Sequence, residues 1–350
     1  MIAAGGTAGH VVPALAVARA LRDDGAEVAF IGGERAEAQL VPAAGFELHR
    51  IAVEGLSRSH PLRAARALLR AAWALPRSRS LLRSLRAEAV LGGGGYVSAP
   101  VGLAALTLRL PVVLTEADSH LGLSNRALAP FARRVCLAFP IDGRGEPRYR
   151  VTGRPVPASS ADRASARERF GIPPQAQCAL VFGGSLGSRS INAAAVEAFA
   201  GAPFHVLHIC GRRDYGELAA RELPPGYVLR AYLDSEAFAG ALEAADLAVA
   251  RAGGSVFELA VHGLPAILVP YPHAAGDHQS TNARWMTDAG AARVIADAEL
   301  TAARLSREVA ELLGDPAALS AMARAARSLA RPDAAQEVAG ELLAAAAKGR

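Results

Sequence analysis

Two glycine-rich turns half a chain apart constrain the fold of this chain more than any other feature. Residues 5–9 (GGTAG) follow the apolar run at 1–4, and residues 183–187 (GGSLG) follow the apolar run at 179–182. A helical pattern comes after each turn. A strand, a glycine turn and a helix in this order form the opening unit of a doubly wound α/β domain. The pair of turns therefore predicts two Rossmann-like domains, each built on a parallel sheet.

The length of the chain supports two domains. At 350 residues it is too long for one ordinary core and suits two domains of roughly 150–180 residues. Prolines stiffen the connection at residues 151–157, which reads VTGRPVP. We expect a first domain over 1–152 and a second over 158–331, followed by a last helix over 333–347.

Composition excludes several classes of protein. The net charge of +5 comes almost entirely from arginine, because Lys348 is the only lysine, and we do not interpret it as nucleic-acid binding. Cys136, Cys178 and Cys210 are widely spaced in apolar segments, which predicts buried free thiols and no metal site. No apolar run approaches the ~18 residues of a membrane span, so we expect a soluble or peripheral protein.

The turn Gly253-Gly254-Ser255 predicts a phosphate site. It follows an apolar run that ends at Ala250, and a helical pattern at 256–262 comes next. Backbone N–H groups at the start of a helix are free and lie at the positive end of its dipole, which favours a phosphate. Glu258 lies one turn into this helix and can reach other groups of the same ligand. The alternative is an ordinary helix cap at Ser255.

Other segments extend this prediction to a crevice. A second apolar run at 266–269 leads to a polar loop that includes Gln279, and parallel strands deliver such loops to one edge of a sheet. Four consecutive glycines at 92–95 follow another expected strand. Because glycine costs backbone entropy on folding, this run indicates a close approach of the backbone, here to a ligand. The alternative for the glycine turns is that they only let a helix pack closely on its strand.

These segments together resemble MurG-type enzymes, a family of GT-B glycosyltransferases. The matching segments are residues 5–10, 91–100, 183–187, 251–258 and 270–282. The resemblance implies an α/β fold of two Rossmann-like, doubly wound parallel-sheet domains with a cleft between them, and a last helix packed back on the first domain. It also implies inverting transfer of N-acetylglucosamine from UDP-N-acetylglucosamine to the MurNAc 4-hydroxyl of undecaprenyl-linked lipid I, forming lipid II in peptidoglycan synthesis.

The resemblance implies partners and a location as well. UDP-N-acetylglucosamine is the donor substrate, and we expect no cofactor. The sequence contains no Asp-x-Asp, so we expect no metal, and helix termini and glycine-loop amides then stabilise the departing diphosphate. A lipid-linked acceptor implies a peripheral enzyme on the cytoplasmic side of the cell membrane, in contact with anionic inner-leaflet lipids and not with nucleic acid.

Roles for single residues follow from the resemblance. Glu258 corresponds to the glutamate that binds the ribose hydroxyls, Gln279 to the glutamine that reads the sugar, and Leu233 to the loop whose backbone reads the uracil. The other residues expected to contact substrate are Thr7, Ala8, Gly9, Asp118, Arg154, Ser185, Gly253, Gly254 and Ser255.

Two positions depart from the family pattern. Asp118 stands where an asparagine is usual, and Pro157 stands where an arginine lies along the nucleotide. Arg154 is either a replacement for that arginine from a different anchor or a solvated linker charge.

The general base for the acceptor hydroxyl has three candidates. His10 ends the first glycine turn, where the family also has a histidine, and a histidine pKa near neutrality suits a base. The alternative is that His10 only holds the turn or touches the diphosphate. Asp118 is the second candidate and Glu116 the third, because both follow the buried strand at 111–114.

The stretch from residue 57 to residue 87 is basic and amphipathic. It contains eight arginines and no acid, with leucines and a tryptophan at helical spacing. Such helices can lie on an anionic bilayer, and we expect Leu69, Trp73, Arg66 and Arg70 to do so. The alternative is that the tryptophan and the leucines belong to the core while the arginines are solvated.

Two further functions remain open from the sequence. One is another GT-B transferase, such as a glycolipid synthase with a diacylglycerol acceptor. The other is a nucleotide-sugar-binding protein without turnover.

Overall fold

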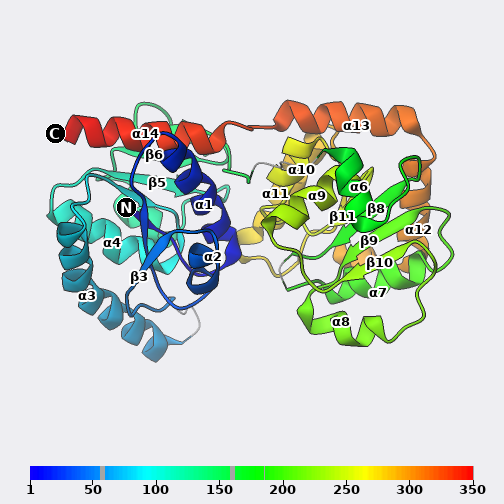
Figure 1. Ribbon diagram of the computed structural model, residues 1–350, viewed down its shortest axis with the longest axis horizontal. Coiled ribbons are helices and arrows are strands. Elements are labelled where there is room, and N and C mark those ends of the chain that lie inside the picture. Colours follow the sequence, from blue (N-terminus) through cyan, green and yellow to red (C-terminus); the bar gives the residue numbers. More distant parts are fainter. Residues whose placement is uncertain (56–59, 158–161, 185, 350) are drawn as a thin grey trace. The chain divides into compact units, whose positions relative to one another are not determined.

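The computed structural model describes residues 1–55, 60–157, 162–184 and 186–349, which form two compact units (Figure 1). Unit 1 comprises residues 1–157 and 331–350, and unit 2 comprises residues 158–330. Ser185, which the sequence places in the donor site, and Arg58, in the basic stretch, lie outside the described residues. Each unit is an α/β domain on a parallel sheet, as the glycine turns predicted.

Unit 1 is built on a seven-stranded parallel sheet with the order β3-β2-β1-β4-β5-β6-β7. The chain moves outward from β1 in one direction and from β4 in the other, so the switch point of the topology lies between these two strands. The strands are β1 Ile2–Ala3, β2 Ala29–Gly32, β3 Glu47–Arg50, β4 Val90–Gly92, β5 Val112–Glu116, β6 Arg134–Leu137 and β7 Tyr149–Val151.

Helices cover both faces of this sheet because successive strand residues point to opposite sides. Ile2 and Phe30 pack with α1 and α14 in one core, and Ala3 and Ile31 pack with α3 and α4 in the other. The helices are α1 Ala8–Asp23, α2 Glu37–Ala43, α3 Pro61–Ser84, α4 Gly95–Thr107, α5 Leu123–Leu128 and α14 Ala334–Gly349.

Unit 2 repeats the plan with six parallel strands in the order β10-β9-β8-β11-β12-β13, so its switch point lies between β8 and β11. The strands are β8 Cys178–Phe182, β9 His205–Ile209, β10 Tyr227–Arg230, β11 Leu247–Ala250, β12 Ala266–Leu268 and β13 Ala292–Val294. The helices are α6 Arg163–Phe170, α7 Arg189–Ala198, α8 Arg212–Ala219, α9 Ser235–Ala244, α10 Val256–His262, α11 His278–Asp288, α12 Ala302–Leu313 and α13 Pro316–Leu329, with 3₁₀ turns at Ala275–Asp277 and Asp297–Glu299.

Two helices differ from the sequence prediction. The segment with Gln279, expected to be a loop, begins helix α11, whose narrow apolar face buries Ala283 and Met286. The first helical pattern was expected after the glycine turn at residues 5–9, but α1 begins within that turn, at Ala8. Proline has no N–H to donate to the carbonyl four residues earlier, so Pro13 leaves the oxygen of Gly9 without its helical partner.

The described residues contain no helix that is both long enough and apolar enough to cross a membrane.

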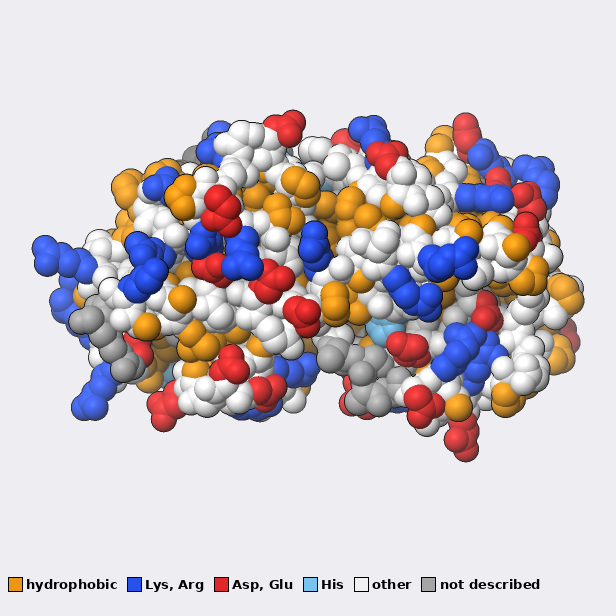
Figure 2. All heavy atoms as spheres, turned by 90° about the horizontal axis from the view of Figure 1, so that it is seen from above, with side chains coloured by type: hydrophobic (Ala, Val, Ile, Leu, Met, Phe, Trp, Pro, Cys, Tyr) orange, Lys and Arg blue, Asp and Glu red, His pale blue; other side chains and the backbone are white. Residues whose placement is uncertain are grey.

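Ion pairs hold α14 to the rest of unit 1. Glu341 accepts hydrogen bonds from Arg134 Nε and Arg150 Nη1, each at 2.8 Å, and Arg150 also pairs with Glu337 at 3.2 Å. Acidic and basic side chains lie side by side on the face of unit 1 that carries α14 (Figure 2). Burial alone would raise the pKa of Glu341, but the hydrogen bonds from Arg134 and Arg150 outweigh it and hold the pKa below its ordinary value.

We predict that Glu341→Gln destabilises unit 1 by about 1–3 kcal/mol at pH 7. A depressed carboxylate pKa stabilises the folded state above the ordinary value of about 4.3, and this stability is lost as the pH falls through the lower folded-state pKa. The difference between wild type and variant should therefore shrink in acid. Urea unfolding followed by circular dichroism at several pH values measures it.

Glu337→Gln is the matched control, because its single pair is longer and more exposed. Equal destabilisation by the two variants would contradict the special role of Glu341.

Candidate functional site

A pocket of about 680 Å³ opens at the switch point of unit 1. The carboxyl ends of adjacent parallel strands meet there, so the turn after β1 and the glycines after β4 form its floor. The loop after β5 and the segment after β7 form further walls, and Ala67 and Ala71 of α3 border it. The residues that line it include Gly6, Thr7, Gly9, His10, Gly94, Gly95, Tyr96, Glu116, Asp118, Asn125 and Arg154.

The four glycines at 92–95 allow close approaches within the protein, and Gly93, Gly94 and Gly95 also line the pocket. A Cβ on Gly95 would lie 1.9 Å from the carbonyl oxygen of Gly5, and one on Gly94 would lie 2.7 Å from His10 Cδ2. Both residues also have positive φ angles, 76° and 87°. The glycines are therefore required because two strand ends and a histidine meet in one place.

His10 lies in the first turns of α1 and lines the pocket. Its Nδ1 is 3.2 Å from the hydroxyl of Thr7. Burial lowers the pKa of His10 first, and the positive charge of Arg154 lowers it further, while Asp118 and Glu37 act in the opposite direction. A histidine whose pKa lies below its ordinary value is neutral at neutral pH and can accept a proton.

Arg154 is anchored in unit 1. Its Nη2 donates to the carbonyl oxygen of Gly9 at 2.7 Å, the oxygen that Pro13 leaves without a helical donor. The arginine thus completes the hydrogen bonding of α1 and places its charge beside His10. This geometry gives Arg154 a defined position at the pocket and makes it more than a solvated linker charge.

Two carboxylates lie at the end of β5 and just after it, and they have different surroundings. Glu116 is buried and accepts hydrogen bonds from Asp118 N at 3.2 Å, Gly122 N at 2.7 Å and Asn125 Nδ2 at 2.9 Å. Burial raises the pKa of Glu116, and the bonds from Gly122 and Asn125 oppose that rise. Its oxygens hold the loop, whereas Asp118 is partly exposed in the same pocket as His10. Of the two, Asp118 is the carboxylate with access to a ligand.

Unit 2 brings two loops of the expected donor site together. Because Phe182 at the end of β8 pairs with Ala250 at the end of β11, the turns that follow these strands leave the sheet side by side. Gly253, Gly254 and Ser255 are partly exposed there, and Glu258 lies one turn into α10. The hydroxyl of Ser255 makes no capping hydrogen bond with the described residues. The structure therefore does not support the alternative of an ordinary cap.

Gln279 is oriented by the loop that follows β12. Its Oε1 accepts a hydrogen bond from Tyr271 N at 2.9 Å, which fixes the orientation of the side-chain amide. Leu233 is partly exposed, and the next residue, Asp234, caps α9 by accepting from Ala237 N at 2.8 Å.

Sequence reasoning missed the residue that ties this edge of unit 2 together. Arg251 is buried, and its Nη1 donates to the carbonyls of Val269 and Pro270 at 3.0 and 3.2 Å. It also pairs with Asp297 at 2.7 Å and donates to Ser190 at 2.8 Å. A lone arginine in a small-residue turn carries no sequence signal for such a role.

Comparison with known proteins decides the family. The N-terminal domain model of glycosyltransferase family 28 matches residues 1–137, and the C-terminal domain model matches residues 178–338. This chain belongs to glycosyltransferase family 28. The resemblance that the sequence indicated is thereby confirmed, and the chain is a glycosyltransferase of the GT-B class.

Similar proteins of this family match over the full length. A UDP-N-acetylglucosamine–N-acetylmuramyl-(pentapeptide) pyrophosphoryl-undecaprenol N-acetylglucosamine transferase from Moorella thermoacetica is 42% identical, covering 97% of this chain and 96% of the relative. A transferase of the same name from Rubrobacter xylanophilus is 44% identical, covering 95% and 99%. The crystal structure of MurG from Acinetobacter baumannii is 31% identical with a TM-score of 0.77, covering 98% of both chains. A kitacinnamycin glycosyltransferase, 22% identical with a TM-score of 0.72, covers 97% of this chain and 98% of its own and shares the fold.

We predict that Arg154→Gln in this family 28 glycosyltransferase raises the pKa of His10. Removing a positive charge that disfavours the imidazolium stabilises the protonated form. NMR titration of the His10 ring in the ligand-free protein measures the shift. Arg133→Gln, which removes the same charge from an exposed position of unit 1, is the control and should leave the titration unchanged. An unchanged His10 titration in Arg154→Gln would show that the arginine has no electrostatic effect there.

Proposed function

We propose that this glycosyltransferase transfers N-acetylglucosamine from UDP-N-acetylglucosamine to the MurNAc 4-hydroxyl of lipid I, with inversion, and forms lipid II. The observation that carries the proposal is the identity of 42–44% over nearly the whole chain with relatives whose names state this transfer. The pocket in unit 1 and the paired loops in unit 2 provide separate sites for acceptor and donor.

The donor is proposed to bind at the edge of unit 2. Backbone N–H groups of the turn at Gly253-Gly254-Ser255, together with the adjacent glycine turn after β8, suit a diphosphate. The carboxylate of Glu258 accepts hydrogen bonds from the ribose hydroxyls, and the oriented amide of Gln279 donates to a sugar hydroxyl. The backbone N–H groups of the two glycine turns stabilise the negative charge that develops on UDP as its bond to the sugar breaks.

The acceptor is proposed to bind in the pocket of unit 1. The first N–H groups of α1, at Ala8 and Gly9, have no partner within the helix, and Arg154 adds a positive charge beside them. This chemistry suits the diphosphate of a lipid-linked sugar. His10 then accepts the proton of the MurNAc 4-hydroxyl as the oxygen attacks the anomeric carbon and UDP departs.

We predict UDP release with UDP-N-acetylglucosamine and lipid I together, and little release when lipid I is omitted. UDP-galactose should be a poor donor, because Gln279 reads hydroxyls of the sugar and galactose has the opposite configuration at its 4-hydroxyl. UDP-glucose keeps the 3- and 4-hydroxyls of N-acetylglucosamine, so its turnover reports on the missing acetamido group instead. Turnover with a diacylglycerol acceptor instead would favour the glycolipid synthase. Donor binding without turnover on any of these acceptors would favour a binding protein.

We predict that His10→Ala lowers kcat at least about a hundredfold, as the loss of a general base does. Asp118→Asn should be nearly neutral, because it restores the amide that is usual in the family. Steady-state kinetics with lipid I measures both. A large loss in Asp118→Asn with a mild effect in His10→Ala would transfer the role to the carboxylate.

The contrasting control lies in unit 2. Glu258→Ala should weaken UDP binding about tenfold or more, as measured by calorimetry, whereas His10→Ala should leave UDP affinity unchanged. Wild-type UDP affinity in Glu258→Ala would contradict its placement at the ribose.

We also propose that unit 1 docks on the inner face of the cell membrane through α3. Trp73 is 82% exposed and Leu69 is 63% exposed, although Leu81 and Leu82 of the same helix are buried. The alternative that the tryptophan belongs to the core is therefore wrong. A large exposed aromatic side chain on a basic helix is typical of a peripheral membrane protein.

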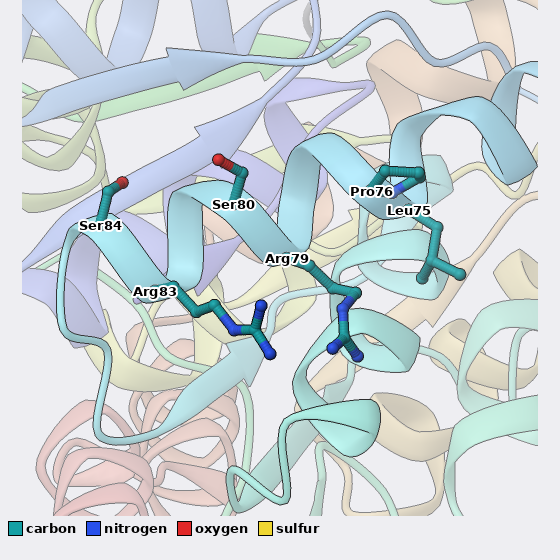
Figure 3. A pocket seen from close by; sticks show the side chains of 6 residues that line it. All are labelled: Leu75, Pro76, Arg79, Ser80, Arg83 and Ser84. Carbon is teal, nitrogen blue, oxygen red and sulfur yellow. The ribbon is translucent and has the colours of Figure 1, made fainter.

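The arginines of α3 differ from the sequence expectation. Arg66 and Arg70 both pair with Glu54, so their charges are partly neutralised within the protein. Further along, Arg79 and Arg83 extend to the same side of α3 and line a groove (Figure 3). Arg79 donates to the hydroxyl of Thr107, whereas Arg83 is exposed. We infer that Arg83 is the better placed for anionic lipid, where an arginine contributes roughly 1 kcal/mol.

We predict that the double variant Leu69→Ser and Trp73→Ser binds anionic vesicles about tenfold more weakly or worse. Both side chains are exposed, so folding and UDP affinity should be retained. Arg83→Glu should weaken binding to anionic but not to neutral vesicles. Co-sedimentation measures these effects, with Tyr215→Ser on α8 as the control for loss of an exposed aromatic. Unchanged vesicle binding by the double variant would contradict the docking surface.

A further inference from the structure

A buried carboxylate lies beneath the first glycine turn of unit 1. Glu37, at the start of α2, is fully buried. It accepts hydrogen bonds from Gly6 N at 2.9 Å, Gly33 N at 2.9 Å and Tyr96 Oη at 2.7 Å. The described residues place no ion-pair partner on it, so these three donors surround the negative charge.

The three donors belong to segments that are far apart in the sequence. Gly6 follows β1, Gly33 follows β2, and Tyr96 lies in the first turn of α4. The fit is tight, because a Cβ on Gly5 would lie 2.8 Å from Glu37 Oε1 and one on Gly33 would lie 2.3 Å from Tyr96 Oη. Two of these segments also line the pocket. One carboxylate therefore sets the distances between three segments around the pocket.

The carboxylate is ionised in the folded protein. Burial alone would raise the pKa of Glu37, but the hydrogen bonds from Gly6, Tyr96 and Gly33 outweigh it and hold the pKa below its ordinary value. The negative charge of Glu37 raises the pKa of His10, as the charge of Asp118 does, whereas the positive charge of Arg154 lowers it.

We propose that Glu37 is a positioning residue for the acceptor pocket, which fixes the first glycine turn and hence the place of His10. The inference rests on the proposed function, because it assigns the acceptor to this pocket. Only a carboxylate can serve all three donors. A glutamine side chain has one acceptor oxygen, and its amide hydrogens would face the N–H of Gly6 or of Gly33.

The test compares Glu37→Gln with Glu34→Gln, which removes the same charge from an exposed position three residues earlier. In Glu37→Gln, KM for lipid I should rise about tenfold, while UDP affinity, a property of unit 2, stays at the wild-type value. NMR on the ligand-free protein should show faster hydrogen exchange at Gly6 or Gly33. The pKa of His10 should fall, because a negative charge that favours the imidazolium is lost. Glu34→Gln should change none of these.

Glu37→Asp separates the effect of the negative charge from the effect of the three hydrogen bonds. It also replaces Glu37→Gln in the test if circular dichroism shows that Glu37→Gln does not fold. The aspartate keeps the charge but is one methylene shorter, so it cannot reach all three donors. KM for lipid I should rise, while the His10 titration stays close to that of the wild type.

Three results would overturn the inference. One is a folded Glu37→Gln with wild-type KM, hydrogen exchange and His10 titration. Another is the same set of changes in Glu34→Gln, and the third is a wild-type KM in Glu37→Asp. The NMR measurements need no substrate, so they judge Glu37 even if the wild-type protein does not act on lipid I.

Discussion

The parallel pairing of β1 with β4, and of β8 with β11, is the constraint on which both candidate sites depend. Each pairing brings together two turns that are separated by tens of residues. Around these turns, backbone segments that are distant in the sequence come within contact distance of one another. A Cβ on Gly95, in the segment after β4, would meet the oxygen of Gly5, in the turn after β1, at 1.9 Å. In unit 2 the turn after β8 approaches the end of the neighbouring strand β9 as closely, because a Cβ on Gly187 would meet the oxygen of Cys210 at 1.9 Å. Glycine at these positions lets the turns at the ends of the strands pack against one another. The pocket of unit 1 lies at this edge of its sheet.

Around that space the protein uses buried carboxylates as acceptors for backbone N–H groups. Glu37 holds the turns after β1 and β2, and Glu116 holds the loop after β5. Both carboxylates are buried. A hydrogen bond in a buried site is stronger than in solution, and an unsatisfied polar group there costs more free energy. Arg154, in contrast, is a side chain that donates a hydrogen bond to the backbone, at the carbonyl oxygen of Gly9. These hydrogen bonds hold the loops around the pocket in place, while His10 and Asp118 line it.

Sequence reasoning succeeded where the signal is local. The end of the strand at Ala250 and the helix at Val256–His262 were predicted at their observed positions, because an apolar run, a glycine turn and a helical pattern lie next to one another. It failed where the cause is distant. Nothing near Pro13 indicates that an arginine 141 positions later supplies its missing donor. Glu37 reads as one more acid in an amphipathic helix, since its three donors come from segments that only the fold assembles. The ligand contacts of the site residues remain predictions.

The return of the chain to unit 1 through α14 has a consequence for biosynthesis. Val338, Ala339 and Leu342 complete the core that α1 begins, yet they are made after the whole of unit 2. During translation, one face of the sheet of unit 1 is therefore incompletely covered until α14 has been made. Unit 2 is contiguous from residue 158 to residue 330, so it can fold before α14 is made. Multidomain chains expose hydrophobic surface in such intermediates. We expect the nascent chain to depend on chaperones until its last helix leaves the ribosome.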